Sequence, residues 1–391
     1  MIKNAPPALP EALERIKAEA NQFQKMGAPA RPGWKEALEQ AGLDQIADIH
    51  ILADGEIVYL HQLSQGCQVC KSGGWDCIFI DHTCNLDCPF CYSPHAISPG
   101  NSGSVLGNTP AEVLANYEKT AISGVSFSGG EPFLEANSLL NWVTSIGAAS
   151  PKRYLWVYTN GLLVTETLLK SLADAGLDEI RFNLAATGYR HKSVLSILET
   201  AARLVPYVTV EIPAIPEQAA ELLGSLKLWT NCGVAYLNLH ELIFEPGTNS
   251  ETMAGEKAEL ITPDHHRTRY HPLSRALAWD VIKKVAAEHI NLAVNDCSLQ
   301  GKLRQLRKRR STLVPLVKAA YEKQVGDDIL QAGCRLDAAG EAVYFSPDSL
   351  NQARQSYPDQ RFFIFSRIAP LSLQNQGQWI SFEEIQPQAE G

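Results

Sequence analysis

The sequence predicts an α/β protein built around a partial TIM-like (β/α)6 barrel. From Cys77 onward, short runs rich in β-branched and aromatic residues alternate with longer stretches of helical apolar spacing, and six such repeats follow one another. Repeats of this kind form parallel strands joined by right-handed helical crossovers. We therefore expect a barrel core at 67–245, preceded by N-terminal helices and a hairpin at 1–66 and followed by an α+β extension at 246–391.

Composition limits the functions that the chain can have. The 391 residues are 45% hydrophobic and 20% charged, which is typical of a soluble globular protein. The net charge of −9 argues against general affinity for nucleic acid or for an anionic membrane. The sequence contains no apolar run long enough for a membrane helix, and its first residues lack the apolar core of a signal peptide. We expect a cytoplasmic protein.

The N-terminal piece is short. Residues 10–24 and 34–41 have helical apolar spacing, and residues 49–63 predict a hairpin that turns at Ala53-Asp54-Gly55. A piece of this size is too small to be a domain of independent function.

The barrel core contains six predicted strands, and helices are expected between them. Thr109, Pro110 and Glu112 form a capping box at the start of one helix, and Gly176 ends another. The predicted strands are 77–83, 124–130, 154–160, 179–185, 207–215 and 234–242, and the further helices are 139–146, 165–175, 193–205 and 218–229.

The C-terminal extension mixes helices and strands. A helix is expected near 273–289 and a basic helix at 301–310, followed by a hairpin that turns at 337–340 and a strand at 361–368. The basic helix is either a grip for an acidic partner or a solvated face, and we favour the solvated face.

A cluster of cysteines follows the first predicted strand. Cys84, Cys88 and Cys91 are spaced by four and three residues, which is too tight for a confident disulfide assignment and is typical of metal ligands. An iron-sulfur cube normally takes four thiolates, so a loop that supplies three leaves one iron open to an outside ligand. The alternative is a structural zinc site, although such sites usually have a complete set of four ligands.

A second motif lies 38 residues beyond Cys91, where Gly129-Gly130-Glu131-Pro132 follows the second predicted strand. The two glycines allow the backbone to approach a ligand closely, and the carboxylate suits an ammonium group. Together, the CxxxCxxC loop and this GGEP segment resemble the radical S-adenosylmethionine (SAM) superfamily. The resemblance extends to the predicted barrel, which is the core fold of that superfamily.

The resemblance implies a 4Fe-4S cluster on Cys84, Cys88 and Cys91, with S-adenosylmethionine on the open iron. It also implies a one-electron reductant such as flavodoxin or ferredoxin, and a 5′-deoxyadenosyl radical that takes a hydrogen atom from a substrate. Gly129, Gly130 and Glu131 match the turn that binds the methionine moiety. The N-terminal piece is too short for the cobalamin domain that some members carry in front of the barrel.

Other candidate residues lie at or near the strand ends, where β/α barrels place their reactive groups. Thr159 and Asn160 follow the third strand and either bind the adenosyl moiety or form an ordinary turn. Asn183 on the fourth strand matches the position of a polar residue that the superfamily uses against the ribose or carboxylate. Later strands alternate apolar and polar residues, which predicts a polar interior that includes Asn238 on the sixth strand.

Two interior residues are candidates for catalysis. Glu211 on the fifth strand and His240 on the sixth share the polar faces of their strands. Each either contacts substrate and passes a proton, or is a satisfied hydrogen-bonding residue near the rim of the barrel.

The remaining cysteines suggest a second metal site. Cys67 and Cys70 form a CxxC pair that needs two more ligands, and Cys297 and Cys334, both expected outside the barrel, are the preferred partners. Such a site would hold an auxiliary iron-sulfur cluster or a single iron or zinc. Free buried thiols are the alternative.

The sequence does not name a substrate. The extra C-terminal region resembles superfamily members that modify peptides or proteins, including activating enzymes of glycyl radical enzymes similar to the pyruvate formate-lyase-activating enzyme. We therefore favour a peptide or protein substrate. The alternatives are a radical SAM enzyme that acts on a small molecule, and a non-catalytic zinc or iron-sulfur binding module.

Overall fold

The computed structural model describes residues 9–26, 34–91, 102–245, 248–249, 253, 258–261 and 267–386. The chain divides into two compact units. The barrel unit comprises residues 30–260 and 267–306, and the terminal unit comprises residues 1–29, 261–266 and 307–391. Each unit has its own sheet and its own hydrophobic core.

The barrel unit is organised around a mostly parallel sheet. Its strands are β1 (Ile49–Leu52), β2 (Ile57–Leu60), β3 (Trp75–Asp81), β4 (Gly124–Gly129), β5 (Tyr154–Thr159), β6 (Glu179–Phe182), β7 (Tyr207–Ala214), β8 (Tyr236–Glu241) and β12 (Ala293–Cys297). Within the described residues their order is β1-β2-β12-β8-β7-β6-β5-β4-β3. The strands from β3 to β8 pair in parallel in sequence order, which confirms the six predicted strands and the partial barrel.

The sheet extends beyond the six predicted strands. β12 pairs in parallel with β8, so that Asn295 lies opposite Asn238 and Cys297 lies opposite His240. The expectation that Cys297 lies outside the barrel was therefore wrong, because the short apolar run before it adds a further strand. The predicted N-terminal hairpin, β1 and β2, pairs antiparallel with the other edge of β12.

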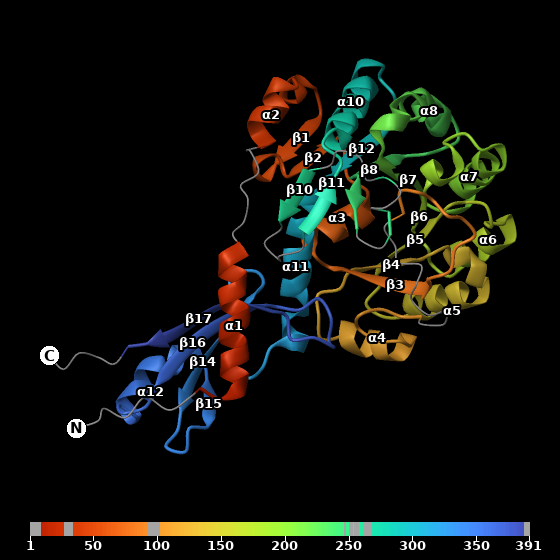
Figure 1. The fold of residues 1–391 in the computed structure, drawn as a ribbon. Helices are drawn as coiled ribbons and strands as arrows, with labels where there is room; N and C mark the ends of the chain where they lie inside the picture. The colour runs from red at the N-terminus through yellow and green to blue at the C-terminus, as the bar shows by residue number, and fades with distance from the viewer. Residues whose placement is uncertain are drawn as a thin grey trace. The chain divides into compact units, whose positions relative to one another are not determined.

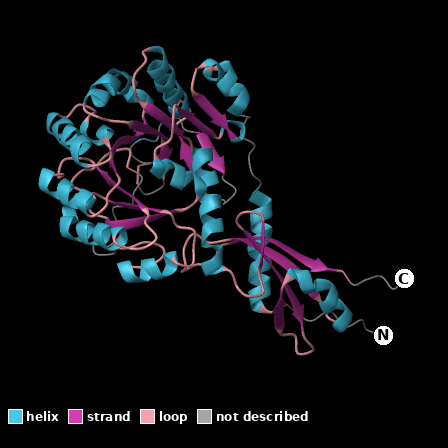
Figure 2. Cartoon of the chain, turned by 180° about the vertical axis from the view of Figure 1, so that it is seen from behind, coloured by secondary structure: helices cyan, strands magenta, loops and turns pink. Residues whose placement is uncertain are grey.

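Helices cover the outer side of this sheet. They include α2 (Trp34–Gln40), α4 (Pro110–Tyr117), α5 (Ala136–Gly147), α6 (Glu166–Asp174), α7 (Lys192–Leu204), α8 (Ala219–Asn231) and α10 (Ser274–Ala287), and α4 to α8 follow one another around the strands (Figures 1 and 2). As the capping box predicts, Thr109 Oγ1 accepts a hydrogen bond from the Glu112 amide. Helix α3 (Gln65–Ser72) contacts β3 and β5. A further small sheet contains β9 (Ile243–Phe244), β10 (Ala258–Ile261) and β11 (Arg267–Tyr270).

The terminal unit combines the two ends of the chain. It contains α1 (Glu11–Met26), α12 (Leu350–Ser356) and the antiparallel strands β13 (Lys323–Val325), β14 (Ile329–Leu336), β15 (Ala342–Phe345), β16 (Phe362–Ile368) and β17 (Gln378–Ile385). β14 and β15 form the predicted hairpin, and β16 is the predicted strand at 361–368. Leu13 and Ile16 of α1 pack on Ala332, Cys334 and Phe365 of the sheet and close the core of this unit.

The basic helix differs from both alternatives that the sequence offered. It is the middle of α11 (Leu299–Val317), and acidic residues oppose several of its cations. Lys308 lies 2.9 Å from Asp327, and Arg310, which is buried, lies 3.5 Å from Asp328. Lys308 and Arg310 thus pair with acidic residues of the same chain, and neither is a purely solvated cation or a cation left unpaired for a binding partner. Among the described residues, no helix has both the length and the apolar character needed to cross a bilayer.

Replacing Leu13 with alanine tests the packing of α1. The Leu13 side chain is fully buried against the C-terminal sheet, so Leu13→Ala should lower the free energy of unfolding of the terminal unit by about 2–4 kcal/mol. Calorimetric unfolding of the full chain measures this change. The exposed variant Lys17→Ala should change the stability by only about 0.5 kcal/mol or less. Equal effects of the two variants would contradict the packing.

Candidate active site

The cysteine loop begins where β3 ends. Cys84, Cys88 and Cys91 are free, partly buried thiols, and the Cys91 amide donates to the Cys88 carbonyl at 2.9 Å. Burial raises the pKa of Cys84, and burial together with the neighbouring Cys91 and Cys84 thiols raises the pKa of Cys88 to about 11. Metal binding to these thiols would therefore release protons, because the thiolate is the ligand.

The backbone of the GGEP turn holds this loop in place. The Gly130 amide donates to the Asp81 carbonyl at 2.9 Å, and the Glu131 amide donates to the Thr83 carbonyl at 2.8 Å. A Cβ on Gly129 would lie 1.9 Å from the Asp81 carbonyl oxygen, and one on Gly130 would lie 1.9 Å from that of Thr83. Both glycines are required here because no side chain fits between the two segments.

Glu131 places a carboxylate beneath this junction. The side chain is 1% exposed, and it accepts hydrogen bonds from Thr159 Oγ1 at 2.8 Å, the Asn160 amide at 2.7 Å and the Phe133 amide at 3.2 Å. Burial raises the pKa of Glu131, and these hydrogen bonds oppose the rise. No cationic side chain among the described residues forms an ion pair with Glu131. A carboxylate has about four acceptor sites, so one remains for a further donor.

Asn160 connects this carboxylate to the cysteine loop. Its amide nitrogen Nδ2 donates to Asn85 Oδ1 at 2.7 Å, and its Oδ1 accepts from the Leu162 amide at 3.0 Å. Thr159 Oγ1 also accepts from the Gly161 amide at 2.9 Å. Thr159 and Asn160 thus do form an ordered turn, and the same turn brings both residues against Glu131 and the cysteine loop.

Asn183 lies at the end of β6. Its Oδ1 accepts from the Ala186 amide at 3.3 Å and so caps the short helical turn that follows. The side chain is partly buried. The structure gives Asn183 a local capping role, and its predicted contact with the cofactor stays a prediction.

The barrel interior contains a buried cation between two carboxylates. Arg181 Nε lies 2.9 Å from Glu179 Oε1, and its NH1 lies 2.6 Å from Glu211 Oε2. Thr209 Oγ1 also donates to Glu179 at 2.6 Å. Burial alone would raise the pKa of Glu211, but Arg181 and then His240 outweigh it and hold that pKa well below its usual range. Removing one member of a buried pair of this kind costs about 3–5 kcal/mol.

The network continues towards the C-terminal ends of β7 and β8. His240 Nε2 lies 2.6 Å from Glu211 Oε1, and Lys302 Nζ lies 3.0 Å from His240 Nδ1. Asn238 Nδ2 donates to Glu211 Oε2 at 2.9 Å. Lys302 is a donor, so His240 accepts at Nδ1 and donates from Nε2–H to the carboxylate. Both ring nitrogens of His240 are therefore engaged.

This arrangement favours a neutral histidine. Burial lowers the pKa of His240 and the Lys302 cation lowers it further, while Glu211 acts in the opposite direction. Arg181 and Lys302 contribute two positive charges, and Glu179 and Glu211 contribute two negative ones. With His240 neutral, the charges of these five described side chains cancel. The sequence did not single out Arg181 or Lys302, because one lies inside an apolar strand and the other in a run of basic residues.

The other predicted metal ligands do not form a four-thiol site. Cys67 Sγ donates to Asn238 Oδ1 at 3.2 Å, and Cys70 and Cys297 lie in the same buried region. Cys334 lies in the other unit, inside the hydrophobic core formed with α1. Within the described residues, no three His, Cys, Asp or Glu side chains are close enough to share one metal ion. Cys334 is therefore separated from the other three, and metal binding by Cys67, Cys70 and Cys297 stays a prediction.

The loop and the turn fit a cofactor that combines an iron-sulfur cube with a cationic ligand. A cube takes one thiolate per iron, so its ligands do not have to converge on a single ion. The three thiols come from one short loop. The Glu131 carboxylate, buried without a cationic partner among the described residues, lies close enough to the loop to raise the pKa of Cys84 and is linked to Asn85 through Asn160. This geometry puts the candidate site at the C-terminal edge of the parallel sheet, where β/α barrels place their reactive groups.

Comparison with known proteins agrees with this site. Residues 78–228 match the family model described as the Radical SAM superfamily. A protein of Methanocaldococcus jannaschii, named as a candidate glycyl-radical enzyme activating enzyme, is 28% identical over 285 residues, which cover 70% of this chain and 73% of that protein. The PqqA peptide cyclase of Rhizobium meliloti is 30% identical over 107 residues, 27% of each chain.

A solved structure is also similar in part. Streptococcus suis SuiB bound to S-adenosylmethionine is 13% identical, with a TM-score of 0.44 over 67% of this chain and 60% of that chain. Residues 78–228 therefore form a radical SAM domain, and together with the M. jannaschii relative this domain indicates an enzyme of the radical SAM class.

Gly130→Ala tests the junction between the turn and the cysteine loop. The added Cβ would overlap the Thr83 carbonyl, so we expect the loop to shift, the iron content after anaerobic reconstitution to fall and the stability to drop by about 1–3 kcal/mol. The control is Gly340→Ala in the terminal unit, where no atom lies within 4 Å of the added Cβ and where the cost of the positive φ stays within a distant hairpin. It should keep the iron content of the wild type. Full iron binding by Gly130→Ala would contradict the proposed constraint.

Lys302→Met tests the state of His240. Removing the cation leaves Glu211 as the nearest charge, so the pKa of His240 should rise. Histidine ring NMR as a function of pH measures the shift, and His240→Gln assigns the resonance. An unchanged or lower pKa would contradict the assignment.

The lowered pKa of His240 also predicts how stability depends on pH. In the window between the folded-state pKa and the ordinary value of 6.5, the unfolded chain binds more protons than the folded chain. The contribution of His240 to stability is therefore fully present above pH 6.5 and is lost as the pH falls through the folded-state pKa. Unfolding measured across this pH range in the wild type and in His240→Gln isolates that contribution.

Proposed function

We propose that this enzyme reductively cleaves S-adenosylmethionine at a 4Fe-4S cluster held by Cys84, Cys88 and Cys91, and that it abstracts a hydrogen atom from a peptide or protein substrate. The observation that carries the proposal is the buried Glu131 carboxylate, which has no ion-pair partner among the described residues and lies under the cysteine loop. A carboxylate in that position favours a bound ammonium group.

Each part of the site has a role in this proposal. Cys84, Cys88 and Cys91 would hold the cluster, which when reduced would supply one electron to the sulfonium of bound S-adenosylmethionine, so that its carbon–sulfur bond would break to give methionine and a 5′-deoxyadenosyl radical. Glu131 would accept a hydrogen bond from the ammonium of the methionine moiety, and Gly129 and Gly130 allow the close backbone contact that holds the turn against the cysteine loop. Thr159 and Asn160 hold Glu131 in orientation and border the adenosyl side, with Asn183 at the next strand end.

Glu211 and His240 serve the substrate side of the barrel. Because Lys302 and Glu211 engage both ring nitrogens, His240 passes a proton only when one of these contacts opens. The whole network is charge-balanced and largely shielded from water, which fixes these groups in position and keeps competing protons away from the reacting atoms.

The relatives support a peptide or protein as the substrate. One is named for the activation of a glycyl-radical enzyme and another for the cyclisation of the peptide PqqA. Both names describe chemistry on a polypeptide. We extend that substrate class to this chain, with a one-electron reductant of the flavodoxin or ferredoxin type as the electron donor. All nine cysteines are free thiols, which agrees with a reducing compartment such as the cytoplasm.

The decisive variant is Cys88→Ala. Wild-type enzyme incubated anaerobically with dithionite and S-adenosylmethionine should release 5′-deoxyadenosine and methionine, and Cys88→Ala should lose this activity by at least about a hundredfold because a cluster ligand is missing. Liquid chromatography with mass detection measures both products. The matched control is Cys232→Ala. Burial also raises the pKa of the Cys232 thiol to about 11, but this residue lies at the C-terminal cap of α8, outside the cysteine loop.

Two outcomes would contradict the proposal. Undiminished 5′-deoxyadenosine from Cys88→Ala would remove the loop from the chemistry. Equal loss in Cys232→Ala would show a general effect of thiol removal. A third outcome concerns only the substrate class. If deuterium is transferred to 5′-deoxyadenosine from a labelled small molecule but not from a labelled peptide, the radical chemistry stands and the substrate is a small molecule.

A further inference from the structure

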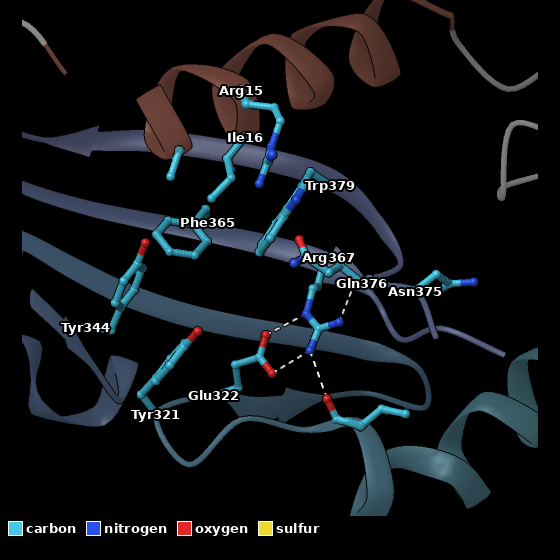
Figure 3. A pocket seen from close by; sticks show the side chains of 12 residues that line it. Arg15, Ile16, Tyr321, Glu322, Tyr344, Phe365, Arg367, Asn375, Gln376 and Trp379 are labelled. Carbon is cyan, nitrogen blue, oxygen red and sulfur yellow. Dashed lines mark hydrogen bonds and ion pairs between the residues drawn. The ribbon is translucent and has the colours of Figure 1, made fainter. Parts of the chain in front are cut away.

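A pocket lies in the terminal unit, and none of the residues of the radical SAM site lines it. Its volume is about 320 Å³, at the lower end of the range for pockets that bind small ligands. The pocket lies between α1 and one face of the C-terminal sheet (Figure 3). Its walls include Arg15, Tyr321, Tyr344, Phe365 and Trp379.

The floor of the pocket is an ion pair between Arg367 and Glu322. Arg367 Nε donates to Glu322 Oε1 at 2.6 Å, and its NH2 donates to Glu322 Oε2 at 2.7 Å and to the Val317 carbonyl at 3.0 Å. Its NH1 donates to the Gln376 carbonyl, and the Ala319 amide donates to Glu322 Oε2. These groups balance each other, so they form a neutral and rigid base that does not select the charge of a ligand.

The pocket lining contains a second cation, Arg15, whose charge the Arg367–Glu322 pair does not neutralise. It extends from α1 towards the sheet, beside Phe365 and Trp379 (Figure 3). Among the described residues, no carboxylate lies within ion-pair distance of Arg15, and its side chain is exposed at the pocket mouth. The charge of the lining is therefore one positive charge from Arg15, since Arg367 and Glu322 cancel.

The remaining walls supply aromatic surfaces and hydrogen-bond donors. Tyr321 and Tyr344 stack with ring centroids 4.9 Å apart, and Phe365 meets Trp379 edge to face at 5.4 Å. In the described part of the chain, neither tyrosine hydroxyl nor the Trp379 indole nitrogen has a hydrogen-bond partner. A pocket with aromatic surfaces, spare donors and one cation suits an anion attached to a flat apolar body.

We propose that this pocket binds an aromatic carboxylate of amino-acid size, with the carboxylate at Arg15 and the ring among the aromatic walls. The same chemistry occurs in a free N-acylated aromatic amino acid and in the C-terminal aromatic residue of a peptide. Binding here is separate from the cleavage of S-adenosylmethionine, so it goes beyond the proposed function and stands or falls without it.

Isothermal titration calorimetry on the full chain tests the proposal with four probes. These are N-acetylphenylalanine, its amide, the peptide Gly-Gly-Phe and its C-terminal amide. Both acids should bind, and each amide should bind at least about tenfold more weakly, because a charged hydrogen bond contributes more than about 1.4 kcal/mol. Tighter binding of the peptide acid indicates a peptide terminus as the natural ligand, and tighter binding of the N-acetyl acid indicates a free compound.

Three variants locate the binding. Arg15→Gln should weaken both acids about tenfold and remove the difference between acid and amide. Lys17→Gln, which removes an exposed positive charge on the same helix outside the pocket lining, should bind like the wild type. Ala12→Trp should fill the pocket and abolish binding of every probe, since Ala12 lines the pocket and is exposed.

The proposal would be overturned by any of three results. The first is the absence of measurable heat with both acids in wild-type protein. The second is binding of acid and amide with equal affinity, and the third is binding that Arg15→Gln and Ala12→Trp leave unchanged. Thermal unfolding of each variant identifies any that fails to fold, and Arg15→Gln, which replaces an exposed residue, keeps the test available if Ala12→Trp does not fold.

Discussion

The contact between two backbone segments is the constraint on which the site depends. The Gly129-Gly130 turn approaches the Asp81 and Thr83 carbonyls so closely that no Cβ fits between them. Two amide hydrogen bonds fix the distance, and they set the cysteine loop directly over the buried Glu131 carboxylate. The backbone therefore fixes the position of the cysteine loop relative to the Gly129-Gly130 turn, and under the proposed function this contact would fix the cluster relative to Glu131.

The barrel interior contains charged side chains that are largely shielded from water. Arg181, Glu179, Glu211 and Lys302 place four charges where water is scarce, and each charge has an opposite or hydrogen-bonded neighbour. Such a network contributes little net stability compared with an apolar core, but breaking it is costly. It therefore acts mainly to fix geometry. His240, held from both sides, joins the charged interior to the strand ends where the cysteine loop also begins.

Local sequence signals predicted the features that depend on local chemistry. The six strands, the capping box at Thr109 and the cysteine loop each have a signature in adjacent residues. Features that depend on pairing over long distances were missed. β12 is a short apolar run in the sequence, and it forms a strand of the barrel sheet because it pairs with β8 on one side and with β2 on the other. Cys334 resembled a possible ligand in the sequence, but the fold places it in an apolar core in another unit. Likewise, the basic run of α11 gave no sign of its acidic partners or of the contact between Lys302 and His240.

The central claim is that three thiols of one loop hold an iron-sulfur cube with an open iron. Metal and sulfide analysis after anaerobic purification and reconstitution, combined with electron paramagnetic resonance of the reduced protein, tests it most directly. The reconstituted protein should contain about four iron and four sulfide per chain, and its spectrum should change when S-adenosylmethionine is added. About one zinc per chain with no sulfide, and no response to S-adenosylmethionine, would contradict it.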